Sequence, residues 1–87
     1  MNAKTPNTKA LVALENVADL PKGRSLVIEG LNRRLNVKRT VDDRSWILQL
    51  EGDRQHARWC DSKAELLEDL EYFYQSDALP VAKQQWF

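Results

Sequence analysis

Hydrophobic residues follow two different spacings along the chain. Over residues 8–19 they recur every three or four positions, which is the spacing of a helix with one apolar side. This apolar stripe consists of Leu11, Leu14, Val17 and Ala18. Thr8 can cap such a helix, and Pro21 with Gly23 ends it. We therefore predict a short N-terminal helix over residues 8–19.

From residue 25 to residue 60 the spacing shortens to two, which is typical of strands that bury one face. Strands are predicted over 25–29, 34–41, 45–51 and 54–60, with a tight turn at Gly52-Asp53. Short connections make neighbouring strands antiparallel. One predicted face is apolar: Leu35, Val37, Trp46, Leu48, Leu50, Ala57 and Trp59. The other is mainly polar: Arg34, Asn36, Lys38, Thr40, Ser45, Ile47, Gln49, Glu51, His56, Arg58 and Cys60.

A second helix is predicted over residues 62–76. Ser62 and Glu65 have the spacing of a capping box, in which the serine hydroxyl accepts from the backbone amide of the glutamate and the carboxylate returns to the cap amide. Its apolar stripe is Leu66, Leu67, Leu70, Phe73 and Tyr74, and its expected solvent side carries Glu68, Asp69 and Glu71. The predicted fold class is α+β: an antiparallel sheet of about four strands with this helix packed on one face.

With 87 residues the chain is expected to form one domain. We predict a disordered N-terminus over 1–7, the domain over 8–79, and a tail over 80–87 that exposes Trp86 and Phe87. These aromatics either fold back over the core or bind a partner. The longest apolar run, five residues over 10–14, is too short for a signal peptide or a membrane helix, so we expect a cytoplasmic protein with no membrane contact.

The charge is balanced overall, with 13 basic and 13 acidic residues, which argues against binding to nucleic acid or lipid by bulk charge. It is uneven along the chain: residues 22–60 hold nine basic and five acidic side chains, whereas residues 61–79 hold one and six. The polar sheet face is therefore a candidate docking face for an acidic partner, through Arg34, Lys38 and Arg58 with His56 beside them. The alternative is an ordinary solvated sheet face.

Catalytic chemistry is not indicated by the sequence. His56 and Cys60 are about 13 Å apart on one extended strand, too far for a nucleophile and its base. The single cysteine cannot form an internal disulfide or, with the single histidine, an ordinary zinc site. No phosphate-binding, dinucleotide-binding, zinc-protease or EF-hand motif is found. We expect no enzyme activity, no cofactor and no metal.

The expected function is that of a small non-catalytic binding protein: a regulator, inhibitor or adaptor that contacts a protein with an acidic surface. Small phage or plasmid proteins of this kind are one candidate class. A second copy of the chain is a further candidate partner. The alternative is nucleic-acid binding through the same face, with Arg33 and Arg39 at its edges. The order of strand, glycine turn, strand and capped helix over 33–74 resembles the arm-binding domain of phage-type tyrosine integrases, although the helix here is acidic. The residues that carry this resemblance are Trp46, Gly52, Arg54, Arg58 and 62–65. The resemblance implies a sheet that enters the DNA major groove.

Overall fold

A computed structural model describes residues 8–53 and 56–80, and residues 85–86 by their backbone. Its elements run α1 (Thr8–Ala18), β1 (Ser25–Glu29), β2 (Arg34–Arg39), β3 (Trp46–Leu50), β4 (His56–Cys60), α2 (Lys63–Ser76) and β5 (Gln85–Trp86). The strands pair antiparallel in chain order, from β1 at one edge to the two-residue β5 at the other. The predicted α+β class, its antiparallel sheet of four main strands and both helices are confirmed.

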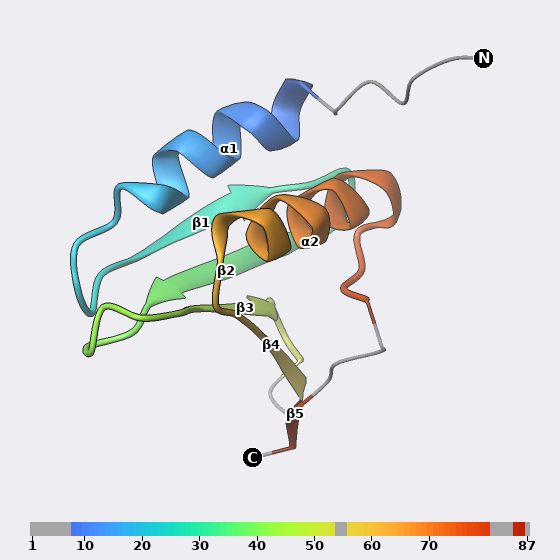
Figure 1. Cartoon of the computed structure of the whole chain (residues 1–87). Helices are drawn as coiled ribbons and strands as arrows, with labels where there is room; N and C mark the ends of the chain where they lie inside the picture. The colour runs from blue at the N-terminus through green and yellow to red at the C-terminus, as the bar shows by residue number, and fades with distance from the viewer. Residues whose placement is uncertain (1–7, 54–55, 81–84, 87) are drawn as a thin grey trace.

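Both helices lie on the same side of the sheet, and the core is the layer between them (Figure 1). The fully buried side chains of this layer come from both helices and from the sheet: Val17, Leu35, Val37, Leu48, Cys60, Leu66, Leu70 and Phe73. No helix of the described residues is long and apolar enough to cross a membrane. On the opposite face of the sheet, the described residues form no helix (Figure 1).

Helix α1 buries a stripe that differs from the predicted one. Ala10, Ala13 and Val17 are buried, whereas Leu11, which was expected on the apolar stripe, is 39% exposed. The helix is rotated so that its alanines face inward, and it contacts α2. Its C-terminal end is fixed to the sheet, because the indole Nε1 of Trp46 donates to the carbonyl oxygen of Val17 at 3.0 Å.

Helix α2 begins as the sequence predicts. The backbone amide of Glu65 donates to Ser62 Oγ at 3.2 Å, so Ser62 is the N-cap. The carboxylate of Glu65 departs from the expected capping box, because it accepts from the amide of Asp61 at 2.9 Å rather than from that of Ser62. This satisfies the amide one residue earlier in the chain.

The end of α2 holds the connection between β1 and β2. Asp77 follows the helix in a left-handed conformation, and its carboxylate accepts from the backbone amides of Leu31 at 2.9 Å and Asn32 at 2.6 Å. Gly30 is required here, because a Cβ at this position would overlap the Asp77 carboxylate and lie 2.6 Å from the ring of Phe73. The β1–β2 loop is thus tied to the helix layer.

Candidate functional site

The faces of β4 are the reverse of the predicted ones. Arg58 was expected on the open face and Trp59 in the core, but Arg58 pairs across the sheet with Leu48 and is only 3% exposed. Trp59 pairs with Ile47 on the open face and is half-buried. Side chains of β4 alternate as expected, but the side that faces the helices is the one that carries His56, Arg58 and Cys60. Arg58 is therefore not a surface residue, and the predicted basic face loses one of its three cations.

A buried polar cluster explains this arrangement. Arg58 Nε donates to Asp69 Oδ2 at 2.7 Å, and the Cys60 thiol donates to the same oxygen at 2.8 Å. Asp69 was expected on the solvent side of its helix, yet it is fully buried. Burial, with the Asp69 carboxylate next in importance, raises the pKa of the Cys60 thiol. A protonated, enclosed thiol is a poor nucleophile, so the cluster joins β4 to α2 rather than presenting reactive chemistry.

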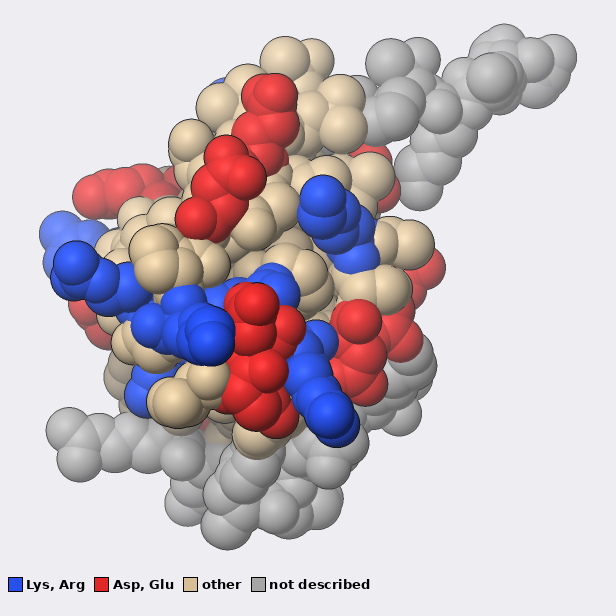
Figure 2. Space-filling view, turned by 60° about the vertical axis from the view of Figure 1, so that its left-hand side comes forward, with Lys and Arg blue, Asp and Glu red and all other residues tan. Residues whose placement is uncertain are grey.

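Of the cations that remain on the open face, Arg34 lies between two carboxylates. Arg34 Nε is 3.7 Å from Glu29 Oε2, and its Nη1 is 3.7 Å from Glu51 Oε2. Lys38 is exposed two positions along the same strand. Lys/Arg and Asp/Glu side chains are likewise intermingled on the side of the molecule shown in Figure 2. The part of the open face formed by the described residues is therefore not a basic patch.

The other predicted site residues are spread over the fold. His56 is half-buried, and its Nδ1 lies 3.3 Å from Asp53 Oδ1 in the β3–β4 turn. Trp86 belongs to β5, where its backbone pairs with His56. Phe87 lies outside the described residues, as does the predicted disordered segment 1–7. The structure thus does not gather Arg34, Lys38, Arg58 and His56 into one surface.

The expected edge residues of a nucleic-acid interface are also engaged within the chain. The guanidinium of Arg39 lies 3.9 Å from the ring centroid of Trp46, and its Nε donates to Asp43 Oδ1 at 2.9 Å. Arg33 Nη2 donates to the carbonyl oxygen of Glu51 at 3.2 Å. These cations are held against the protein surface rather than pointing together at a common ligand.

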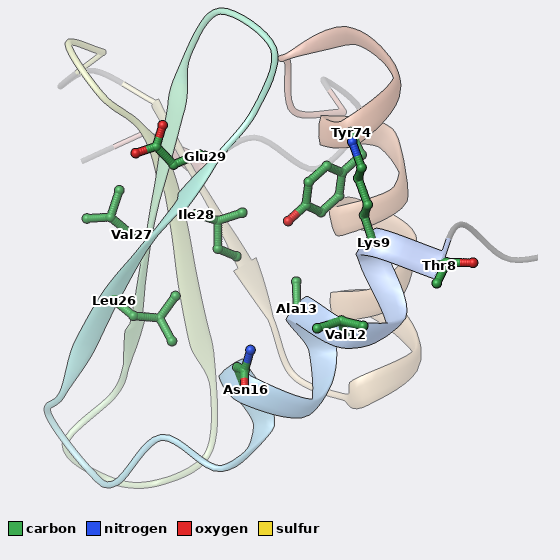
Figure 3. A pocket seen from close by; sticks show the side chains of 10 residues that line it. All are labelled: Thr8, Lys9, Val12, Ala13, Asn16, Leu26, Val27, Ile28, Glu29 and Tyr74. Carbon is green, nitrogen blue, oxygen red and sulfur yellow. The ribbon is translucent and has the colours of Figure 1, made fainter.

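A groove of about 720 Å³ lies between α1 and β1. Figure 3 shows Leu26 and Ile28 pointing from β1 towards α1, which contributes Val12 and Ala13, while Tyr74 closes the groove from α2. Val12 is 53% exposed, although it is a large aliphatic side chain. Burial raises the pKa of Tyr74, so its hydroxyl stays protonated at neutral pH. The groove is a mainly apolar surface, with Lys9 and Glu29 among its polar residues.

The strand that borders this groove is an edge of the sheet. The amide of Arg39 donates to the carbonyl of Arg24 at 2.8 Å, and the amide of Gly30 donates to the carbonyl of Arg33 at 2.8 Å. In an antiparallel ladder alternate residues face the partner strand, so positions 24, 26, 28 and 30 face β2. The N–H and C=O groups of Ser25, Val27 and Glu29 consequently point outward from the sheet.

This edge has few of the features that usually protect an exposed strand, apart from its short length and the charge of Glu29 at its end. Its central residues, Leu26, Val27 and Ile28, are apolar, and the strand contains neither lysine nor proline. Val27 is 53% exposed on the open face. The sequence showed that 25–29 is a strand, but not that it lies at an edge beside a groove, since this depends on the order of the strands and the position of α1.

Comparisons with known proteins place this chain in no group. No family model, no curated protein and no solved structure matches it. Two residues that carry the resemblance to the integrase arm-binding domain, Trp46 and Arg58, are buried in the core layer. The candidate site is thus defined by the geometry of β1 and the groove.

Proposed function

We propose that this chain is a small non-catalytic binding protein that acts through protein–protein contacts, as a regulator, inhibitor or adaptor. We place its binding surface at the edge of β1 and in the groove beside it. The observation that carries the proposal is the combination of an edge strand with an apolar centre and a mainly apolar groove of about 720 Å³ along it. Monomeric proteins usually avoid such a combination, because an open edge pairs with other chains.

The partner that fits this surface is an extended segment that adds a strand to the sheet. Its backbone would bond to the outward N–H and C=O groups of Ser25, Val27 and Glu29. Alternate side chains of an added strand point to opposite faces, so every second one would enter the side lined by Val12 and Ile28. We therefore propose a partner segment with apolar residues at alternate positions.

The alternative of nucleic-acid binding has less support than the sequence suggested. It relied on a basic sheet face, but Arg58 is buried against Asp69, and Arg34 lies between two glutamates. Clustered, accessible cations are what phosphate contacts require. No observation in the described part of the chain favours this function over protein binding.

The proposal can be tested with proline at one outward-pointing position. Val27→Pro removes an amide that points out of the sheet, so the β1–β2 hydrogen bonds remain while an added strand is blocked. Val41→Pro is the matched control: Val41 is 73% exposed and is the second residue of the turn closed by the Asp43 amide and the Thr40 carbonyl, where proline is accepted.

The probe is a displayed library of random peptides, selected on the wild-type chain, with folding of each variant checked by circular dichroism. We expect selected peptides to carry alternating apolar residues, to bind Val41→Pro, and to lose binding to Val27→Pro. Equal binding to both variants would place the peptide site elsewhere and refute the proposal. A duplex DNA titration at increasing salt completes the test, since tight, sequence-selective DNA binding would favour the alternative function.

A further inference from the structure

The outward-facing positions of β1 are arranged symmetrically. Ser25, Val27 and Glu29 are spaced evenly about Val27, so an antiparallel copy of β1 would place Val27 opposite Val27 and Ser25 opposite Glu29. Each of these opposed pairs would exchange two backbone hydrogen bonds, which satisfies all the outward groups of the strand. We propose that the segment docked on β1 is the β1 strand of a second copy, giving a two-fold dimer with one sheet continuous through both chains. This inference rests on the proposed function of the β1 edge.

Side chains on the two faces are compatible with this pairing. On the helix side, Leu26 of one copy would lie opposite Ile28 of the other, so the apolar rows of the two sheets would join. The two grooves, each lined by Val12 and Ala13, would then open towards each other across the axis. On the open face, exposed Val27 side chains would meet at the axis and bury apolar surface that each chain now leaves in contact with water.

Charges on the open face point to the same register. Within a chain Ser25 pairs with Lys38, and Glu29 pairs with Arg34. The row across the dimer would therefore read Lys38 and Ser25 of one copy, then Glu29 and Arg34 of the other. Lys38 and the second copy's Glu29 would be two strands apart, about 10 Å between Cα atoms, with only the small Ser25 side chain between them. The long lysine side chain can span this distance, and the pair would occur twice by symmetry.

This symmetry allows a test based on charge reversal. Lys38→Glu alone would bring two glutamates within reach of each other at both ends of the interface, and Glu29→Lys alone would do the same with two lysines. A mixture of the two variants would form a heterodimer in which both pairs are complementary again. All the altered side chains are exposed, so the fold should tolerate each substitution.

The measurements are light scattering over a concentration series, with native mass spectrometry to identify the species. We expect the wild-type chain to form dimers, each single variant to dissociate roughly tenfold more readily, and the mixture to form the one-to-one heterodimer preferentially. Val27→Lys, which brings two charges together at the axis, should be monomeric, and Val41→Lys should dimerise as the wild type does. Val27 and Val41 are both exposed, which makes this pair a control for the added charge.

Several results would overturn the inference, and they are distinguishable from failure of the proposed function. A wild-type chain that stays monomeric refutes the dimer, but the function stands if library peptides still bind and depend on Val27. A dimer that persists in Val27→Lys forms through another surface. A mixture that associates no better than either charge variant shows that the register about Val27 is wrong.

Discussion

The buried ion pair between Arg58 and Asp69 makes a quantitative prediction about stability. The two side chains are 3% and 0% exposed and are joined by a 2.7 Å bond. Arg58→Met would leave the carboxylate buried with only the Cys60 thiol as its donor among the described residues. Removing one member of such a pair typically costs about 3–5 kcal/mol. The free energy of unfolding of a domain of this length is about 4–13 kcal/mol in total, so this single variant should lose about a quarter of its stability or more and unfold at a clearly lower urea concentration.

Removing both charges should be far less costly than removing one. In the double variant Arg58→Met with Asp69→Leu, no charge has to be buried, and we expect its stability to lie within about 2 kcal/mol of the wild type or above it. The wild-type pair also leaves Arg58 Nη1 and Asp69 Oδ1 buried without a hydrogen-bond partner among the described residues. That cost disappears when both side chains are apolar.

Urea unfolding of the wild type, both single variants and the double variant provides the coupling energy of the pair. The exposed pair formed by Arg34 and Glu51, 3.7 Å apart, is the control: Arg34→Met and Glu51→Leu should each cost less than about 1 kcal/mol and combine additively. If the costs of Arg58→Met and Asp69→Leu also add, so that the double variant is the least stable of the four, the two side chains do not depend on each other and our account of the core is wrong.

Three further predictions follow from individual positions. Because burial raises the pKa of the Cys60 thiol, the native state keeps a proton that the unfolded thiol releases above about pH 8.5. Above that pH the free energy of unfolding of the wild type should therefore fall about 1.4 kcal/mol per pH unit more steeply than that of Cys60→Ala. Equal slopes for the two proteins in urea unfolding at several pH values would contradict this. Ser62→Ala should cost about 1 kcal/mol through loss of the N-cap, and an unchanged melting temperature would show that the cap contributes nothing. Gly30→Ala should cost about 1–3 kcal/mol, because its methyl group would overlap the Asp77 carboxylate, and calorimetry that finds no loss would refute that close contact.

The sequence by itself determined the two helices and the four main strands, although not β5, because these elements depend on residues close together in the chain. Ser62 caps α2 through an amide three residues away, and Gly52 adopts φ +90 in the turn after β3. The alternation of β2 and β3 placed Leu35 and Leu48 in the core as expected. Because the connections between strands are short, neighbouring strands had to be antiparallel. The α+β class could therefore be predicted from segments close together in the sequence.

The faces of β4 and the buried side of α1 were decided only by the tertiary structure. A pattern that alternates between His56, Arg58 and Cys60 on one side and Ala57 and Trp59 on the other normally places the polar set in water. Here Asp69 compensates the charge of Arg58, although it lies eleven residues away on another element. Burial of a charge depends on whether a partner meets it in space, and hydrophobic spacing along one strand carries no information about that partner.

The candidate site was also decided only by the tertiary structure. That residues 25–29 form a strand could be read from the sequence, but its position at the sheet edge is set by the order in which all the strands pair. The groove beside it lies between β1 and α1, where Val12 stays exposed, so it depends on how α1 is placed over the sheet. Edges and grooves are relations between elements far apart in the chain, so they appear only when those elements have packed.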